Sequence, residues 1–504
     1  MNSPRKSRPR LTRRSSMPVS PVAAKPNKQT VLDTMGHEHA GEVLIDTLKS
    51  RFFALGLQAG IALNCFVVSV AVMVVSYDPR SGAIYVLSGS YYPLYRALLL
   101  ISVFGCCHGL NLFVFKRFGV DYRAIYGVGF EHNYHVVLRG CFTLMSLVFL
   151  SFMLFVFTLT SGLTPNRHLW PAVALLGAAA LFAWPWDIYA EWHDARQRHA
   201  LLRAVCRVLV APFSEASFAH CFLADVFTSM PKIFVDVLQT GCLYASGGIF
   251  AANWDKASQR FESGNAACTN ANLSYKVPLI VLSVLPFWLR LMQCCRAYRD
   301  TSAKKNIVNG CKYCSSIAVV LLSFVKDPEH PGGAVDYVWA ATAIFSTAFT
   351  MTWDVVMDWG HGPAWLRGFA HGAEFGRPSS APLLRTSRAY PLWSYYVALV
   401  YNGCARLGWA VYISPGQTVV QQHVVLLLGC VELLRRAQWA TFRLEWEQIH
   451  RHLHDEPTEE ESIWPSPRGA ERPVTLEQAL SRNRDMMQTR YTLMEPNEPE
   501  ESER

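Results

Sequence analysis

Charged residues are scarce in this sequence, and their scarcity excludes most soluble architectures. Only 17% of the 504 residues are Asp, Glu, Lys or Arg, whereas 51% are hydrophobic. Ordinary soluble domains carry about 25% charged residues. A soluble multidomain enzyme, a disordered scaffold and a collagen-like fibre are therefore excluded, and the composition predicts a polytopic membrane protein.

The sequence also lacks the motifs of common enzyme classes. It contains no Walker loop, no G-x-S-x-G elbow and no H-E-x-x-H zinc helix. His450, His452 and His454 form a weak metal signal in a polar stretch, and surface histidines explain them better. We therefore expect no enzyme activity, no cofactor and no metal site.

The 14 cysteines do not predict a disulfide scaffold. Most lie inside apolar runs, where a thiol behaves as a small hydrophobic group. These are Cys65, Cys106, Cys107, Cys141, Cys242 and Cys430. Cys311 and Cys314 form a lone C-x-x-C without a second pair, and helix packing explains it better than zinc or redox chemistry.

Ten apolar runs predict membrane-spanning helices. A bilayer core needs about 20 mainly apolar residues per helix, and the runs lack the period-two alternation of membrane strands. The first run begins near Phe52, too far from the start for a cleavable signal peptide. The predicted spans are 52–77, 94–115, 137–160, 169–189, 232–252, 277–293, 313–325, 337–357, 391–413 and 419–434. We therefore expect an all-α transmembrane bundle of about ten spans.

The placement of Lys and Arg predicts that both termini are cytosolic. With a cytosolic N-terminus, the inward loops hold seventeen Lys and Arg and the outward loops hold six, as the positive-inside rule requires. An even number of spans returns the C-terminus to the same side. The only N-glycosylation sequon, at Asn272, then lies in an outward loop.

Charge and hydropathy divide the chain into four parts. Residues 1–50 are predicted to be a basic, disordered cytosolic tail, because residues 1–30 carry eight Lys or Arg and no acid. Residues 51–215 would form scaffold helices, and 216–454 the pathway domain. Residues 455–504, with thirteen acids and six arginines, would be an acidic disordered tail. The basic tail suits an anionic membrane surface better than nucleic acid, since no aromatic residues accompany it.

Charged residues inside the predicted spans need an explanation, because a charge at the bilayer centre costs at least ~2.5 kcal/mol. They are Asp225 and Asp236 at the fifth span, Lys312 with Tyr313 at the seventh, Asp354 and Asp358 at the eighth, Arg406 with Trp409 in the ninth, and Arg435 with Arg436 at the tenth. The i, i+4 spacing of the two eighth-span carboxylates puts both on one helix face.

Arginines and a lysine that converge with a few carboxylates in a dry environment suit a tetrahedral oxyanion such as phosphate. Guanidinium groups match its oxygens bidentately and stay charged at any physiological pH. The carboxylates would hold the arginines in place when the site is empty. The alternatives are that Lys312, Arg435 and Arg436 only anchor span ends, or that the charges form a purely structural network. Arg406, about two turns inside its span, is the hardest to explain in these ways.

Several separated motifs make the chain resemble the EXS family. They are GLNLFVFKRFGVDYRAIY, FLADVFTSMPKIFVDVLQTGC, PFWLRLMQCCRAYRDT, NGCKYCSS, WDVVMDWG and RRAQWATFRLEWE. The likeness runs from residue 109 to about residue 450. The family includes the retroviral-receptor phosphate exporters and the shorter fungal proteins needed to retain residents of the endoplasmic reticulum.

Within the family, the chain is similar to the short Golgi branch. The larger exporters carry a cytosolic SPX domain before the first span, and fewer than about 50 residues precede that span here. The resemblance implies that the protein returns inorganic phosphate from the Golgi lumen to the cytosol. This would support glycosylation and the retention of residents, at the Golgi membrane rather than the plasma membrane.

The resemblance also implies roles for individual residues. Asp225 matches an acidic position of the phosphate pathway, and Lys312, Arg406, Arg435 and Arg436 match phosphate-contacting positions. Neighbouring pathway or gate positions match Tyr313, Asp354, Asp358, Trp409 and Ser229. Thr228 stands where the exporters often show Asn, and its hydroxyl still donates a hydrogen bond. Movement of the ninth span with Trp409 as a plug is the predicted gate.

The sequence therefore predicts a phosphate transporter that works downhill, because no ATP motif is present; a channel and a carrier fit equally well. The predicted partners are inorganic phosphate, membrane lipids, a second copy of the chain and Golgi glycosyltransferases or sorting factors, but not nucleic acid. The alternative is a membrane adaptor that transports nothing and recruits glycosyltransferases or sorting factors through its charged tails.

Overall fold

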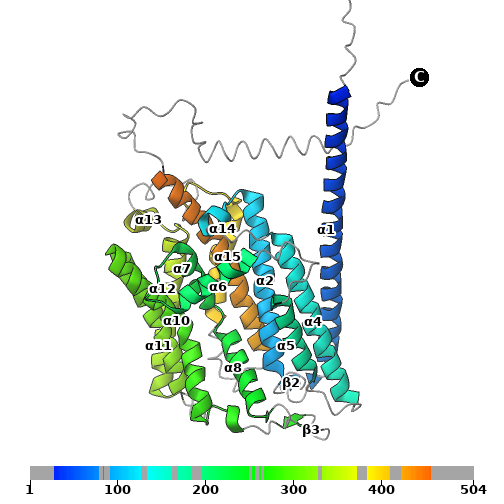
Figure 1. Ribbon diagram of the computed structural model, residues 1–504. Helices are drawn as coiled ribbons and strands as arrows, with labels where there is room; N and C mark the ends of the chain where they lie inside the picture. Colours follow the sequence, from blue (N-terminus) through cyan, green and yellow to red (C-terminus); the bar gives the residue numbers. More distant parts are fainter. Residues whose placement is uncertain are drawn as a thin grey trace, which may run out of the picture. The chain divides into compact units, whose positions relative to one another are not determined.

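The computed structural model is an α-helical bundle (Figure 1). It describes residues 28–75, 77–78, 83–84, 91–126, 133–161, 169–183, 195–248, 253–255, 260–262, 266–326, 332–371, 383–408 and 422–455. Within these ranges the strands form two short antiparallel hairpins, β1 (Tyr77–Asp78) with β2 (Ala83–Ile84) and β3 (Asn253–Asp255) with β4 (Arg260–Glu262). The prediction of an all-α fold is confirmed.

Helices account for the rest of the regular structure. In chain order they are α1 (Lys28–Val75), α2 (Tyr92–Phe118), α3 (Tyr122–Tyr126), α4 (Tyr134–Ser161), α5 (Leu169–Ala183), α6 (Ala195–Leu209), α7 (Phe218–Phe227), α8 (Pro231–Ala245), α10 (Leu273–Thr301), α11 (Lys304–Val325), α12 (Ala334–Trp353), α13 (Ala364–His371), α14 (Leu392–Arg406) and α15 (Gln422–Asp455). A 3-10 turn, η3 (Ala266–Cys268), precedes α10, and a π-helical turn, η4 (Asp354–Asp358), continues α12.

The chain divides into two compact units, residues 1–54 and 55–504. In the first unit, residues 28–54 are helical and form the beginning of α1. This helix starts inside the segment 1–50 that was predicted to be a disordered tail. All other elements belong to the second unit.

Within the part of the chain that the structure describes, five helical segments are long and apolar enough to cross a membrane, and the chain is a multi-pass membrane protein. They are Lys49–Val72, Tyr92–Phe118, Tyr134–Thr158, Leu273–Thr301 and Lys304–Val325. Each of the ten predicted spans overlaps a helix, but α5, α8 and α14 contain 15 residues each. A helix of that length rises only about 22 Å, less than the hydrocarbon core of about 30 Å. The count of ten and the side of each terminus therefore stay predictions.

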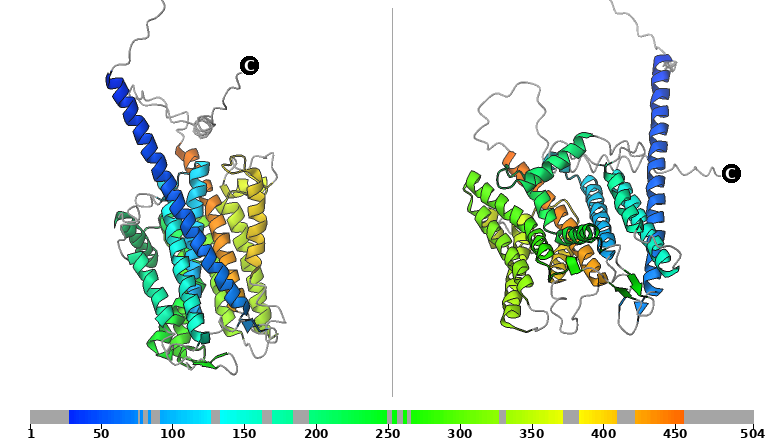
Figure 2. Two further views of the ribbon diagram at one scale, coloured as in Figure 1. Left: turned by 90° about the vertical axis from the view of Figure 1, so that its right-hand side faces the viewer. Right: turned by 60° about the horizontal axis from the view of Figure 1, so that its bottom comes forward.

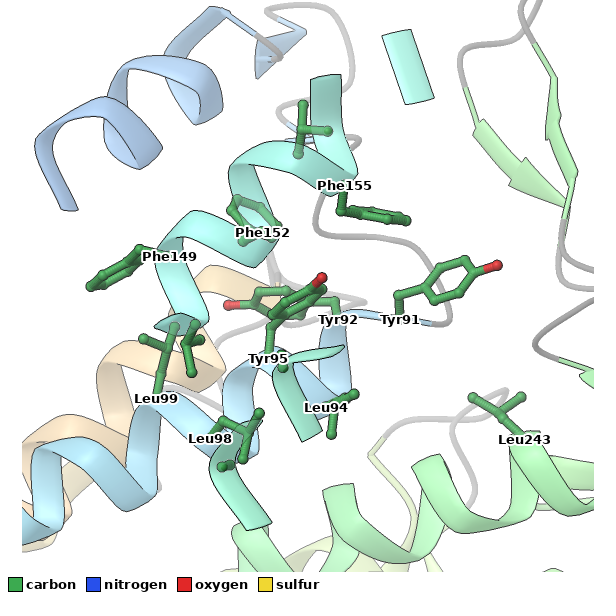
Figure 3. Packing of buried hydrophobic residues seen from close by; sticks show 14 of the residues in the cluster. Tyr91, Tyr92, Leu94, Tyr95, Leu98, Leu99, Phe149, Phe152, Phe155 and Leu243 are labelled. Carbon is green, nitrogen blue, oxygen red and sulfur yellow. The ribbon is translucent and has the colours of Figure 1, made fainter. Parts of the chain in front are cut away.

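The first half of the second unit is held together by an apolar core between α2 and α4 (Figure 3). Pro93 stands in the first turn of α2, where its missing N–H costs nothing, and every residue from Tyr91 to Leu100 is buried. The ring of Tyr95 meets Phe152 of α4 edge to face, with 5.3 Å between the ring centroids. Leu243 of α8 also joins this core. Such contacts suit the scaffold role predicted for this part of the chain.

Helix α15 connects this core to the second half. It packs against α2 on one side and α14 on the other, and Figure 2 shows it in orange between them. Leu433, Trp439 and Leu444 are almost fully buried. Glu432, Arg435, Arg436 and Trp439 recur at i, i+3, i+4 and i+7, so they share one face of the helix. This polar face carries much of the site described below.

Cys242 of α8 forms a disulfide with Cys268 at the end of η3. The prediction that Cys242 is only a small apolar residue was therefore wrong. The pairing depends on how the segment after α8 returns toward that helix, and the spacing of the two cysteines does not reveal this. Disulfides persist in oxidising compartments, which agrees with the outward position predicted for the segment between α8 and α10.

Candidate functional site

A charged cavity of about 330 Å³ lies among α7, α11, η4, α14 and α15. Nine of the eleven predicted site residues line it: Asp225, Thr228, Lys312, Tyr313, Asp354, Asp358, Arg406, Arg435 and Arg436. Ser229 is hydrogen-bonded to one of these lining residues, Arg436. Trp409 lies outside the described residues. The structure thus gathers residues that are up to 211 positions apart in the sequence.

A break between α7 and α8 supplies one wall. Asp225 lies in the last turn of α7, Thr228 caps that helix, and Pro231 begins α8. The Thr228 hydroxyl donates to the Asp225 carbonyl at 2.6 Å, a local bond that satisfies a carbonyl at the helix end. Interrupted helices of this kind form ion and substrate sites in many transporters, because unpaired backbone groups are tolerated only where they line a cavity.

The Asp225 carboxylate is held by two donors. Arg290 of α10 donates from Nε to Oδ1 at 2.7 Å, and the Tyr313 hydroxyl donates to the same oxygen at 2.5 Å. Arg290 also donates to Gln293 Oε1 at 2.6 Å. Arg290 and Tyr313 together therefore fix the Asp225 carboxylate at the cavity wall.

Asp354 joins two arginines from different helices. Arg406 of α14 donates to its Oδ2 from both Nε, at 3.1 Å, and Nη2, and donates to the Thr350 hydroxyl at 2.9 Å. Arg435 approaches the same carboxylate oxygen at 3.5 Å and donates to Asn402 Oδ1 at 3.2 Å. Asp354 begins the π-helical turn η4, a form of helix that is frequent at functional sites. One carboxylate oxygen therefore positions two guanidinium groups.

Glu432 and two hydroxyls hold the arginine pair of α15. Glu432 receives a bidentate pair of hydrogen bonds from Arg435, at 2.7 and 2.6 Å, and one from Ser229 at 2.5 Å. Arg436 donates to the Ser229 hydroxyl at 2.7 Å and to the Thr228 hydroxyl at 2.9 Å. The Arg436 guanidinium also lies 4.6 Å from the centroid of the Trp439 ring. The partners of Arg436 in direct contact are thus all neutral.

Lys312 is the second cation of the cavity without a carboxylate partner. Its side chain is buried, with 7% of its surface exposed. The ammonium lies 4.4 Å from the ring centroid of Tyr313 and 5.1 Å from that of Trp353. Among the described residues, neither Lys312 nor Arg436 has a carboxylate oxygen within 4.0 Å. Two buried positive charges therefore line the cavity without a carboxylate in direct contact, although carboxylates of the same site attract both of them.

Asp358, at the other end of η4, has a different set of partners. It accepts a hydrogen bond from the Trp439 indole at 3.0 Å, and Arg443 Nε lies 3.7 Å from its Oδ1. Both Asp354 and Asp358 line the cavity, as their predicted common face requires. They have different arginine partners.

A second cavity, of about 720 Å³, meets the first at Asp225, Asp358 and Trp439. Its other lining residues include Arg290, Lys305, Arg443 and His371. Burial lowers the pKa of His371, so its ring is neutral at pH 7 and Nε2 donates to the Val356 carbonyl at 2.7 Å. The second cavity gives the charged cavity a polar continuation that is lined with both basic and acidic side chains.

Sequence reasoning missed three contributors to this site. Arg290 lies inside the sixth predicted span, so the rule that singled out Arg406 would also have found it. Glu432 stands three residues before Arg435, at a spacing that pairs side chains on one helix face. Trp439 carries no charge, and nothing in its sequence context distinguishes it from a packing residue.

The chain was compared with known proteins. A model described as the EXS family matches residues 91–449. The chain is 27% identical over 370 residues to SPX and EXS domain-containing protein 1 of Dictyostelium discoideum, covering 71% of this chain and 37% of that protein. It is 28% identical over 425 residues to Xenotropic and polytropic retrovirus receptor 1 homolog of Xenopus laevis, and 27% identical over 416 residues to Solute carrier family 53 member 1 of Homo sapiens. Each of these two matches covers 79% of this chain and 55% of the relative, so the chain spans about half the length of these relatives or less.

Proposed function

Because the chain belongs to the EXS family, we propose that it transports inorganic phosphate across a membrane. The resemblance to phosphate exporters implies this substrate, and the chemistry of the cavity supports it. Phosphate carries one or two negative charges near neutral pH and presents oxygens on all sides. Guanidinium and ammonium donors from three helices, α11, α14 and α15, meet these requirements.

The observation that carries the proposal is that two buried cations of the cavity, Lys312 and Arg436, have no carboxylate in direct contact. In a purely structural network we would expect each buried cation to be paired directly. In the proposed mechanism a phosphate ion supplies the missing negative charge. Arg406 and Arg435, already held by Asp354 and Glu432, would then add hydrogen bonds at little entropic cost, because their side chains are fixed before the ion arrives.

Asp354 and Glu432 would also keep phosphate binding reversible. Each competes with phosphate for the guanidinium groups, and conduction requires a site weak enough to release its ion. The second cavity would connect the site to the cytosolic side, where Lys305 and Arg443 would attract anions. No ATP motif is present, so the ion would move along its electrochemical gradient.

We further propose a Golgi location, with transport from lumen to cytosol in support of glycosylation and the retention of residents. This part rests on the resemblance to the short Golgi branch alone. The proposed acceptor compartment is the side reached by the second cavity.

The test is radiolabelled phosphate flux into vesicles that contain the purified protein. We expect flux with wild type, and competition by unlabelled phosphate at lower concentrations than by sulfate. Arg406→Ala and Arg436→Ala should each reduce flux at least about tenfold, because each removes a guanidinium donor and a hydrogen bond to a charged group contributes about 1.5–3 kcal/mol. Arg299→Ala is the matched control, since this arginine lies on the surface with 70% of its side chain exposed.

If Arg406→Ala and Arg436→Ala were correctly inserted and monodisperse but carried phosphate at the wild-type rate, transport through this site would be ruled out. Deletion of residues 456–504 separates the proposal from the adaptor alternative. A transporter should keep its flux without this tail, whereas an adaptor that acts through the tail should lose its partners.

A further inference from the structure

Three free cysteines with exposed side chains lie close together on α10 and α11. They are Cys295 near the end of α10, Cys311 in the first half of α11, and Cys314 in the middle of α11. The neighbouring Cys294 is buried. The thiols of Cys295, Cys311 and Cys314 therefore face the surroundings of the bundle rather than its interior.

The packing of the two helices puts Cys295 and Cys311 at the same level. A Cβ placed on Gly310 would lie 3.4 Å from Leu291 Cδ1 and 3.7 Å from Cys294 Cβ. Gly310 thus packs directly on Cys294, and the adjacent residues Cys311 and Cys295 flank this contact. Cys314 interacts electrostatically with both other cysteines and lies about one helical turn further along α11 than Cys311.

The disulfide identifies which side of the membrane these thiols face. Cys268 is oxidised and lies five residues before α10 begins, whereas Cys295 lies six residues before that helix ends. Helix α10 has 29 residues, enough to cross a bilayer. The disulfide needs an oxidising compartment, so the other end of α10 lies on the reducing, cytosolic side. There the thiols remain free.

Basic residues indicate where the cytosolic membrane surface lies. Arg296 and Arg299 follow Cys295 in the last turns of α10, and Lys304 and Lys305 open α11. Arg and Lys at the ends of spans lie at the level of the lipid headgroups. Cys295 and, packed beside it, Cys311 therefore lie just below the cytosolic headgroups, where their side chains face lipid.

We propose that Cys295 and Cys311 are S-acylation sites. Membrane-proximal cysteines on the cytosolic side are the usual acceptors of palmitoyl groups. In the reaction, the cysteine sulfur attacks the thioester carbonyl of a long-chain acyl-coenzyme A. A new thioester forms on the protein, the bond to coenzyme A breaks, and the thiol proton passes to the departing coenzyme A sulfur. The acyl chains would lie in the cytosolic leaflet against α10 and α11.

An acyl-exchange assay on the full-length protein, expressed in eukaryotic cells, tests this inference. Disulfides are reduced and all free thiols are blocked. Thioesters are then cleaved with hydroxylamine, and each released thiol receives a maleimide-polyethylene glycol tag that shifts the band. We expect Cys295→Ser and Cys311→Ser each to remove one tag, and the double variant to remove two. Cys404→Ser is the matched control, because Cys404 is also free and exposed but belongs to α14.

Two results would overturn the inference. They are the absence of hydroxylamine-dependent tags on wild type, and the loss of fewer than two tags in the double variant. Size-exclusion profiles establish that each serine variant is folded, and Cys295→Ala with Cys311→Ala provides a second pair. The inference does not depend on phosphate transport.

Discussion

Arg96–Asp236 and Arg406–Asp354 are both buried Arg–Asp pairs that link helices, and they differ in what surrounds them. Arg96 of α2 binds Asp236 of α8 through both carboxylate oxygens, at 2.7 Å each, and the two side chains are 2% and 0% exposed. Arg406 of α14 donates twice to a single oxygen of Asp354 and keeps 15% of its side chain exposed. The first pair is sealed in the protein, whereas the second borders a cavity and shares its carboxylate with another arginine.

The difference shows that an intramembrane charge does not by itself indicate a ligand site. In the sealed pair, Arg96 is matched by both oxygens of Asp236, and the partly exposed Lys232 adds a further contact to Asp236 at 2.9 Å. In the cavity pair, Asp354 serves two guanidinium groups, while Lys312 and Arg436 nearby have no carboxylate partner. The first arrangement stabilises the contact between α2 and α8, and the second leaves positive charge for an anion.

The largest expected effect is the loss of folded protein when the sealed pair is broken. Arg96→Ala leaves Asp236 with only the half-exposed Lys232, and the loss of one partner of a buried pair costs about 3–5 kcal/mol. We expect a lower yield and a clearly lower melting temperature in detergent. Arg406→Ala should destabilise the protein less, because Asp354 keeps Arg435.

Replacing both partners separates the two pairs more sharply. Arg96→Met with Asp236→Leu removes both charges from a sealed site, and such replacements are often neutral for stability. This variant should recover stability and retain phosphate flux in vesicles. Arg406→Met with Asp354→Leu should also fold but lose flux. If the first double variant lost flux and the second kept it, the assignment of roles would be reversed.

A smaller effect is expected at Lys312. Lys312→Met removes one uncompensated charge from the cavity, and a hydrogen bond to a charged group contributes about 1.5–3 kcal/mol. The phosphate concentration for half-maximal flux should rise about ten- to a hundredfold. Lys312→Arg keeps the charge and should raise this concentration less. Equal half-maximal concentrations for the Met and Arg variants would show that the lysine only packs against Tyr313 and Trp353.

Local sequence features predicted the fold class and much of the site's composition. The hydropathy runs located helices at all ten predicted spans, because burial in lipid requires long apolar segments. The expense of charge in those segments singled out Asp354, Arg406 and Arg436. These rules act within one helix, so a single sequence contains the necessary information.

Pairing between helices was beyond those rules. Asp236 was noted as an intramembrane charge in the same way as Asp225, and nothing local distinguishes its sealed partner, Arg96, from the site arginine Arg290. The Cys242–Cys268 disulfide was not predicted from the sequence for the same reason. Which charge meets which depends on the packing of α2, α8 and α10, and that packing is set by many apolar contacts together.

The smallest expected effect concerns an apolar cavity of about 380 Å³ among α2, α4, α7 and α15, which shares Arg436 with the charged cavity. Gly140 of α4 lines it, and a Cβ there would meet no atom within 4 Å. Gly140→Leu should fill part of this space and raise stability by about 1 kcal/mol, since glycine also disfavours helix by that amount. Thermal unfolding measures the gain, and phosphate flux should stay within twofold of wild type. A loss of flux comparable to that of Arg436→Ala would show that the anion site depends on the shape of the apolar cavity as well as on its own charges.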